Sequence, residues 1–525
     1  MRLGIDFGTT RTVVAYCDRG NYPILTFVPE EGDALDGFPS LVAEREGELR
    51  FGLEALAVEN DPSFVVVRSF KRLLGENDAR PDQRVRVGSI ELPVIELLVR
   101  FLSALRDAIR ERSNLPRGIA RDQEMIAVVA TPANALGTQR FLTLEAFRRA
   151  GFAVAATLNE PSAAGFEYTH RYRNTLTARR EHIVVYDLGG GTFDASLVHL
   201  RGRTHDVITT AGLHRLGGDD FDAVLVELAL SAADLRRDSL DPRALARLEG
   251  QCRDAKERLH PSSRRMVFDL DFVLGGSTPA REITVATAEY YEACAPLVDR
   301  TIEAMLPVME RLDRDVKDAH SENEDSISAA LAGIYVVGGA SALPVVGRIL
   351  RERFGRKVHR SAYPSAATAV GLAIACDPDA GFELTDRFAR SFGVFRETSA
   401  GRDVGFDPIF TRETAVPSPD AVVTSTRTYR AAHNIGHYRF VECATVDAAG
   451  LPQGDVTLFA DVLFPFERSL QAQDAPADLR SVPVHRLPGE GAAVRETYTL
   501  DAHGIVQLTI ADLETGHVRE YRIGA

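Results

Sequence analysis

The sequence predicts an α/β domain followed by a smaller all-β domain. Strand-like and helix-like segments alternate over roughly the first 375 of the 525 residues, which is the pattern of an α/β architecture. From about Cys376–Gly381 to Ala525 the pattern changes to short alternating runs between turn signals, as expected of a β-sheet domain. A chain of this length is also too long for a single core, so two or more domains are expected.

Apolar runs and helical periodicity place the elements of the α/β part in order. Phe141, Leu144 and Phe147 share one face of a periodic segment that Gly151 ends. The expected strands are Leu3–Ile5, Thr12–Tyr16, Ile126–Val129, His182–Tyr186, Ala195–Leu200 and Ile334–Val337. The expected helices are Gln139–Ala150, Leu225–Leu230, Ala244–Leu259 and Leu343–Phe354.

The C-terminal part reads as strands alone. Alternating runs predict strands at Tyr438–Glu442, Val456–Phe459 and Ile505–Ile510, with a turn at Asp501–Gly504 before the last one. We therefore predict an α/β domain over residues 1–378, an interdomain linker over 379–390 and a β-sandwich domain over 391–525.

Composition argues against several classes of function. The formal net charge of −14 opposes non-specific nucleic-acid binding, which needs a basic face. The five cysteines are scattered without a CxxC pair, so we expect buried free thiols in a reducing cytoplasm rather than a disulfide framework or a zinc site. The N-terminus shows no signal peptide, and no apolar run approaches the roughly 18 residues that span a bilayer. A cytoplasmic protein without nucleic-acid or membrane partners is expected.

Two similar segments carry the strongest chemical signal. Gly4–Thr10 and Val185–Thr192 each combine a strand, an Asp and a Gly-rich turn with Thr, and 181 positions separate Asp6 from Asp187. Glycine lets backbone N–H groups close around phosphate oxygens, and threonine hydroxyls add donors. An Asp at each strand end can hold a divalent cation, usually through water. Two such turns facing each other across a cleft would hold a polyphosphate from both sides, although a single copy is most often a hairpin.

Other nucleotide-binding signatures are missing from the sequence. It has neither the GxxxxGK[ST] of a P-loop nor the GxGxxG of a Rossmann domain. A third glycine pair, Gly338-Gly339, lies between an expected strand and an expected helix. It would let a base or a ribose approach the backbone, and a tight strand-to-helix turn is the alternative interpretation.

In this order, the three elements resemble the superfamily of actin, sugar kinases and heat-shock 70 kDa proteins. Five segments narrow the resemblance to the heat-shock 70 kDa branch over residues 1 to about 376. Val67–Gly75 is similar to the segment that carries the family's catalytic lysine, and Ala130–Pro132 with Gln139–Arg140 is similar to its proline switch. Leu158–Ala164 is similar to the family motif NEPTAA. Tyr186–Asp194 is similar to the motif DLGGGTFD, and Leu216–Asp222 is similar to LGGEDFD. A fainter match, Asp501–Ile505, resembles the end of the family's substrate-binding β-sandwich. The resemblance implies an actin-like ATPase domain of two ribonuclease-H-like lobes, followed by a β-sandwich.

The resemblance also implies roles for the matching residues. Lys71 would stabilise charge at the γ-phosphate and position the attacking water, and Glu160 would hold a metal-bound water. The implied sets are catalytic Asp6, Lys71, Glu160, Asp187 and Thr192; nucleotide-binding Gly8, Thr9, Thr10, Gly189, Gly190, Gly191, Gly217, Gly218, Lys256, Gly338 and Gly339; metal-contacting Asp6, Asp187 and Asp194, mostly through water; and domain-coupling Pro132 and Arg140. The alternatives are a solvated Lys71, a helix-capping Glu160 and a water-facing Asp194.

The implied function is that of an ATP-dependent chaperone. It would use ATP/ADP, Mg²⁺ and K⁺, hydrolyse ATP slowly and bind unfolded or extended polypeptide through strand-type contacts of its β domain. A J-domain co-chaperone and a nucleotide-exchange factor are the implied partners. The alternative is a nucleotide-gated regulatory or scaffold protein with a dedicated partner and little turnover. A kinase of the same superfamily fits less well, because the NEPSAA and LGGDDFD segments and the β part argue against it.

Several positions depart from the family pattern. Arg253 stands where the family has Glu, Glu257 where it often has Arg or Ile, and His260 where it has Ser. Ala342 stands where the family has an Arg that stacks on the base. Losing that stacking partner predicts ATP binding weaker by about tenfold. Arg11 follows the first turn where a small polar or aromatic residue is usual. The Leu-rich linker is not preserved, which puts coupling in doubt, and a missing helical lid predicts fast client exchange.

Overall fold

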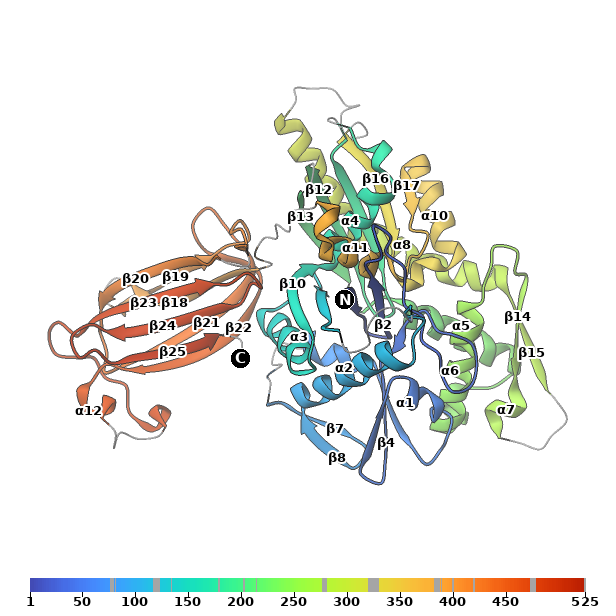
Figure 1. The fold of residues 1–525 in the computed structure, drawn as a ribbon, viewed down its shortest axis with the longest axis horizontal. Helices are drawn as coiled ribbons and strands as arrows, with labels where there is room; N and C mark the ends of the chain where they lie inside the picture. The colour runs from blue at the N-terminus through green and yellow to red at the C-terminus, as the bar shows by residue number, and fades with distance from the viewer. Residues whose placement is uncertain are drawn as a thin grey trace.

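The computed structural model describes residues 1–75, 80, 82–116, 123–133, 135–177, 180–201, 204–213, 215–275, 281–319, 330–381, 388, 390–398, 401–418, 421–472 and 478–523. Within these residues the chain forms an α/β part built on two five-stranded sheets and a β part built on two four-stranded sheets. The β part lies at the left of Figure 1, beside helix α3 (Gly137–Arg149) and strand β10 (Ala153–Asn159) of the α/β part.

The two five-stranded sheets have the same strand order and the same strand directions. Each begins with a three-stranded antiparallel meander, and two later strands extend the sheet in parallel from the meander's first strand. The first sheet runs β3 (Phe38–Pro39), β2 (Arg11–Tyr16), β1 (Arg2–Phe7), β9 (Ile126–Thr131) and β10. The second runs β13 (Thr204–Leu213), β12 (Phe193–Arg201), β11 (His182–Leu188), β16 (Leu331–Val337) and β17 (Val358–Arg360). Helices cover the central strands, which explains their continuous apolar runs.

Close backbone contacts hold helix α11 (Ala367–Cys376) against strand β1 and helix α4 (Glu160–Arg171). A Cβ on Gly4 would lie 2.2 Å from the backbone nitrogen of Ala373, and one on Gly371 would lie 1.7 Å from the carbonyl oxygen of Ala163. Only glycine permits these approaches, so both glycines position α11. The other helices are α1 (Leu53–Ala57), α2 (Val94–Glu111), α5 (Gly218–Ala233), α6 (Pro242–Glu257), α7 (Leu270–Leu274), α8 (Thr287–Ala319) and α10 (Pro344–Phe354).

Smaller sheets extend the α/β part. A three-stranded sheet consists of β4 (Leu41–Arg45), β5 (Glu48–Phe51) and β6 (Val65–Arg68). One hairpin consists of β7 (Arg84–Val87) and β8 (Ile90–Pro93), and a second consists of β14 (Arg265–Asp269) and β15 (Glu282–Ala286). The 3₁₀ turn Phe70–Gly75 follows β6 and carries Lys71.

The β part packs two antiparallel sheets around one apolar core. The first runs β19 (Asp403–Phe410), β18 (Ser391–Thr398), β21 (Ile435–Val446) and β22 (Pro452–Pro465). The second runs β20 (Val423–Arg430), β23 (Ala493–Leu500), β24 (Val506–Asp512) and β25 (Val518–Ile523), and the short helix α12 (Arg468–Gln471) follows β22. Phe392, Phe440, Phe464, Tyr498 and Leu508 are fully buried in this core.

A charged network lies inside the same core. Glu496 is fully buried and accepts hydrogen bonds from Arg396 Nη2 at 2.5 Å and from the Tyr498 hydroxyl at 2.5 Å. The Tyr429 hydroxyl also donates to Glu496, and Arg396 Nε donates to Asp407 at 2.7 Å. A buried carboxylate is tolerated only when paired and hydrogen-bonded in this way.

Each predicted strand and helix falls on an observed one and extends past it by at most two residues, but several observed elements are longer, such as α5, which begins seven residues before the predicted Leu225–Leu230. Helices α1, α2, α4, α7, α8, α11 and α12 were not predicted. Most of the predicted linker, residues 382–387 and 389, lies outside the described residues. The domain limits 1–378 and 391–525 stay predictions. No helix in the described part of the chain is long and apolar enough to cross a membrane.

Candidate functional site

The two Gly-rich turns lie against each other. The first joins β1 to β2 and contains Gly8, Thr9 and Thr10, and the second joins β11 to β12. A Cβ on Gly190 of the second turn would lie 2.6 Å from the Cγ2 atom of Thr10. The turns therefore approach closely through a position that only glycine fits, with 180 positions of chain between them.

The N-terminus of helix α5 is bound to the second turn. The backbone N–H of Gly218 donates to the Gly189 carbonyl at 2.9 Å, and that of Asp219 donates to the Gly190 carbonyl at 2.8 Å. A Cβ on Gly217 would lie 2.5 Å from the backbone nitrogen of Gly191. The two motifs predicted to contact phosphate thus form one continuous backbone surface, and Gly189 N–H closes the turn on the Thr192 carbonyl at 2.9 Å.

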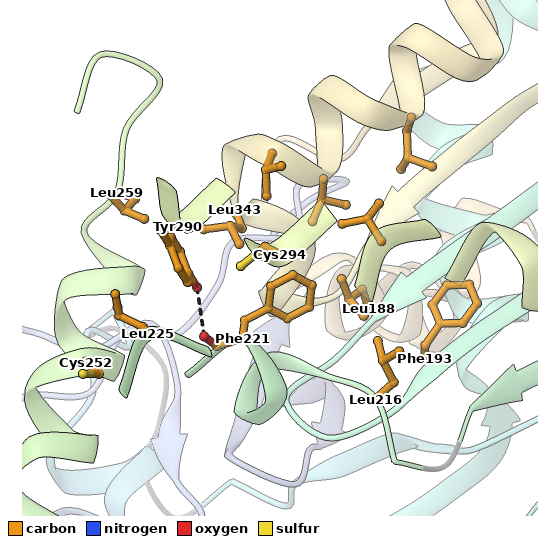
Figure 2. Packing of buried hydrophobic residues seen from close by; sticks show 14 of the residues in the cluster. Leu188, Phe193, Leu216, Phe221, Leu225, Cys252, Leu259, Tyr290, Cys294 and Leu343 are labelled. Atoms are coloured by element: carbon orange, nitrogen blue, oxygen red, sulfur yellow. Dashed lines mark hydrogen bonds between the residues drawn. The ribbon is translucent and has the colours of Figure 1, made fainter. Parts of the chain in front are cut away.

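The residues on either side of the second turn pack into the apolar core of the second sheet. Leu188 and Phe193, which flank the turn, and Leu216, just before Gly217, are fully buried in it (Figure 2). The Tyr290 hydroxyl donates to the carbonyl of Phe221 on α5 at 3.1 Å, which joins α5 to α8. Side chains that anchor both ends of each glycine segment hold the flexible backbone in one conformation.

Four carboxylates and one lysine gather at these turns. Burial, together with the charge of Glu160, raises the pKa of Asp6 to about 7 and that of Asp194 to about 7, against the opposing effect of Lys71. The pKa of Asp187 is raised well above its usual range, first by burial and then by Glu160 and the other two aspartates. Mutual repulsion of this kind means that the cluster has a deficit of positive charge.

Lys71 is the nearby cation. Its Nζ lies 3.6 Å from Glu160 Oε1 and over the ring of Phe7, 5.4 Å from the ring centroid, and the residue is 8% exposed. The alternative interpretation of Lys71 as a solvated lysine is therefore wrong. Glu160 is the first residue of α4, and Asn159, whose side chain accepts from Ser162 N–H at 2.8 Å, is the N-cap instead. Asp194 also differs from a water-facing strand residue, because burial and the charge of Glu160 raise its pKa.

The donor set fits a hydrated cation better than a directly ligated one. Among the described residues no group of three His, Cys, Asp or Glu side chains converges to hold a metal ion. Mg²⁺ keeps several waters in most protein sites and takes one or two carboxylates directly. The charge deficit of Asp6, Asp187 and Asp194 is the feature that a hydrated divalent cation would neutralise.

The expected nucleoside contacts lie around the second turn. Gly338, with φ of 86°, lies so close to Asp187 that a Cβ would be 2.3 Å from its Oδ1 atom, and Gly339 begins the following 3₁₀ turn. Lys256 Nζ donates to the Gly218 carbonyl at 2.8 Å and pairs with Asp222 Oδ1 at 2.6 Å. The lysine expected at a ribose is thus held beside α5 by a buried aspartate.

Two residues that depart from the family pattern form an ion pair across the site. Arg11, directly after the first turn, pairs through Nη2 with Glu257 Oε1 of α6 at 3.1 Å. Nearby, Arg72 Nη2 pairs with Asp219 Oδ2 at 2.7 Å. Both pairs join the part of the chain that carries the first sheet to the helices of the second. The Arg11–Glu257 pair was not predicted, although both residues stood out as departures.

Arg140, one of the two residues expected to couple the domains, lies where α3 contacts the β part, and we call this contact the seam. Arg140 is buried on α3, and a Cβ on Gly504 would lie 2.9 Å from its Nη1 atom. Gly137, the first residue of α3, donates its N–H to the carboxylate of Glu442 at 2.9 and 3.2 Å. Pro132 directly follows β9, five positions before this helix. Glu442 was missed from the sequence, where an acidic residue at the end of an apolar run was the one available signal.

Comparison with known proteins identifies relatives over nearly the whole chain. The family model described as Hsp70 protein matches residues 118–435. The chaperone protein HscA of Cronobacter sakazakii is 30% identical over an alignment that covers 98% of this chain and 77% of that protein. A chaperone protein HscA homolog of Colwellia psychrerythraea is 28% identical over the same shares of the two chains.

Proposed function

This chain belongs to the Hsp70 family, and from this premise we propose that it is a chaperone-type ATPase that hydrolyses ATP slowly and binds unfolded or extended polypeptide through its β part. The observation that carries the proposal is the contact between the two Gly-rich turns, Thr10 against Gly190, with four carboxylates and Lys71 beside it. Two opposed glycine turns with a cation deficit suit a polyphosphate and its divalent metal.

The backbone of the two turns would hold the phosphates. The proposed contacts are Gly8, Thr9, Thr10, Gly189, Gly190, Gly191 and Thr192, with Gly217, Gly218, Lys256, Gly338 and Gly339 toward the nucleoside. Asp6, Asp187 and Asp194 would hold Mg²⁺, mostly through water, and Mg²⁺ supplies neutralisation of charge on the phosphate oxygens. Potassium is the proposed monovalent ion.

Lys71 and Glu160 would act on the reacting water. The ammonium of Lys71 is fixed by Glu160 and by the face of Phe7, so it presents a preorganised positive charge. Such a charge stabilises negative charge that grows during phosphoryl transfer and costs no reorganisation at that moment. Glu160 lies among the aspartates, where a carboxylate accepts a hydrogen bond from a water and orients it.

The seam at α3 would carry the nucleotide state to the β part. Pro132 and Arg140 are the coupling residues implied by the family, and the bond from Gly137 N–H to Glu442 ties the start of α3 to strand β21. We further propose that the two sheets of identical order are two ribonuclease-H-like lobes within residues 1–378. Residues 391–525 would then form the client-binding domain, which a J-domain co-chaperone and a nucleotide-exchange factor would serve.

The test is single-turnover ATP hydrolysis by the full chain with Mg²⁺ and K⁺, with and without an unfolded polypeptide. The proposal predicts slow hydrolysis that the polypeptide accelerates. Tight ATP binding without turnover, or hydrolysis that ignores the polypeptide, would instead indicate a nucleotide-gated scaffold with a dedicated partner. A variant of the seam, Arg140→Ala, should keep basal hydrolysis and lose the acceleration.

A further inference from the structure

Arg72, the residue after Lys71, lies on the second Gly-rich turn. A Cβ on Gly191 would lie 2.0 Å from Arg72 Nη2, 2.9 Å from its Cζ atom and 3.0 Å from its Nε atom. The guanidinium therefore packs directly against the backbone of Gly191, at a distance that leaves no room for a side chain on that residue. Arg72 was not among the site residues predicted from the sequence, so this contact needs an explanation of its own.

The guanidinium of Arg72 is held in this place from the side of α5. Arg72 Nη2 pairs with Asp219 Oδ2 at 2.7 Å, and the Asp219 N–H donates to the Gly190 carbonyl at 2.8 Å. Asp219 lies in the first turn of α5, where the helix dipole favours a carboxylate. One aspartate thus binds both the glycine turn and the guanidinium, and it fixes where Arg72 lies relative to Gly191.

The 3₁₀ turn that carries Lys71 and Arg72 is anchored on both sides of the two cations. Phe70 and Leu74 are buried in the core of the first sheet. The Arg72 N–H donates to the Ser69 carbonyl at 3.0 Å, and Ser69 has a φ of 56°, a conformation that residues other than glycine adopt at a cost in free energy. The fold therefore maintains, against local strain, the backbone that directs two neighbouring cations to the site.

The guanidinium keeps hydrogen-bond donors for a ligand. Within the described part of the chain, its one ion pair uses Nη2, and neither Nη1 nor Nε donates a hydrogen bond. The Arg72 side chain is also about half exposed, so a ligand can reach it. A guanidinium is planar and binds phosphate oxygens through two parallel N–H groups. A phosphate held by the backbone of the Gly191 turn would lie within reach of these donors.

We infer that Arg72 is a further catalytic residue, which contacts the terminal phosphate of ATP, and that Asp219 is its positioning residue; this role rests on the proposed function. In hydrolysis the oxygen of a water bonds to the terminal phosphorus, and the bond from that phosphorus to ADP breaks with its electron pair going to ADP. One water proton stays on the inorganic phosphate, and the other passes to solvent. Arg72 stabilises the charge on the phosphoryl oxygens from the side of α5, and Lys71 does so from the side of Glu160.

A purely structural role for Arg72 predicts a different result. If Arg72 only joins the two parts of the site through Asp219, then Arg72→Gln and Asp219→Asn break the same ion pair and have equal effects. A contact with phosphate belongs to the guanidinium alone. Loss of Arg72 then costs more than loss of Asp219, because Asp219→Asn leaves the cation in the site.

The experiment measures single-turnover ATP hydrolysis by the full chain with Mg²⁺ and, separately, equilibrium binding of ADP and of the non-hydrolysable β,γ-imido analogue of ATP. Arg72→Gln should lower the rate by roughly 10–100-fold and weaken binding of the analogue, with ADP affinity within about threefold of wild type. Arg72→Lys should restore part of the rate, and Asp219→Asn should lower it by less than about fivefold. Arg237→Gln is the matched control, because Arg237 pairs with Glu227 and Glu249 on the exposed surface of α5 and α6.

The measurements separate failure of this role from failure of the proposed function. A wild type that binds neither nucleotide overturns both. Hydrolysis by Arg72→Gln within about threefold of a turning-over wild type, or equal losses in Arg72→Gln and Asp219→Asn, overturns the role of Arg72 alone. If the wild type binds ATP without turnover, an unchanged ratio of analogue to ADP affinity in Arg72→Gln overturns it. Loss of ADP binding in both Arg72→Gln and Arg72→Lys would mean that the residue maintains the fold of the site and does not act on the terminal phosphate.

Discussion

Replacing Lys71 with Met removes the cation beside four carboxylates while keeping a side chain of similar length. Lys71 Nζ lies 3.6 Å from Glu160 Oε1, and the two side chains are 10% and 20% exposed. At an effective dielectric constant of about 20, a unit charge pair at that separation attracts by about 5 kcal/mol before desolvation is counted. In the proposed role, Lys71 would therefore bring a substantial positive charge to a transferring phosphoryl group.

We expect Lys71→Met to lower the single-turnover rate of ATP hydrolysis by roughly 10²–10³-fold, the usual loss for one preorganised electrostatic group. ATP affinity should change by less than about tenfold, because backbone N–H groups of the two turns would hold the phosphates. Rates with radiolabelled ATP and an equilibrium titration separate the two effects. Arg100→Met is the control, since Arg100 pairs with Glu96 on the exposed face of α2. Hydrolysis by Lys71→Met within about threefold of wild type would refute the role given to this lysine.

Three further substitutions test the seam, the cross-site ion pair and the β core. Burial raises the pKa of Glu442 to about 7 from 4.5, so docking of the β part should weaken as the pH rises from about 5 through 7, and Glu442→Gln should abolish that dependence. A Phe459→Trp reporter can follow this docking, because the chain has no tryptophan and Phe459 lies against the seam. Glu257→Gln should speed ADP release by up to about fivefold, measured by displacement of a fluorescent analogue, because a half-exposed ion pair contributes about 1 kcal/mol or less. Glu496→Ala should lower the free energy of unfolding of the β part by about 3–5 kcal/mol in urea, because it removes the buried carboxylate that pairs with Arg396 and accepts from the Tyr429 and Tyr498 hydroxyls.

Each of these has an outcome that contradicts it. A pH-independent tryptophan signal in the wild-type background would mean that Glu442 keeps an ordinary acidity in the docked chain. Slower ADP release from Glu257→Gln would mean that the ion pair opposes closure rather than supporting it. The Glu490 side chain is 84% exposed, so Glu490→Ala should change stability by less than about 0.5 kcal/mol. An equal loss in Glu490→Ala and Glu496→Ala would remove the special role of the buried network.

Local sequence patterns were sufficient for the turns and most of the elements around them. Gly189–Thr192 and its neighbouring strands were predictable because glycine, the preceding Asp and the flanking apolar runs all act within a few residues. Helix α2 could have been found in the same way, since Leu98, Phe101, Leu102 and Leu105 recur at helical spacing and are buried.

Contacts between distant segments were not predictable. Glu442 and Gly137 are 305 positions apart, and nothing near either residue indicates the other. The Arg11–Glu257 pair arises in the same way, because packing of whole elements brings the two residues together. The resemblance to the family indicated the role of Lys71, but its burial and its pairing with Glu160 are properties of the folded chain.

The most direct test of the central claim is an ATP titration of the wild type, Gly190→Ala and Gly347→Ala, each with Mg²⁺ and with a chelator. A Cβ on Gly190 would meet Thr10 at 2.6 Å between the two turns, whereas one on Gly347 of α10 would meet nothing within 4 Å. We predict Mg²⁺-dependent binding to the wild type and to Gly347→Ala, and binding at least about tenfold weaker to Gly190→Ala. A wild type that binds no ATP, or a Gly190→Ala variant that binds it as tightly as the wild type, would contradict a nucleotide site between the two turns.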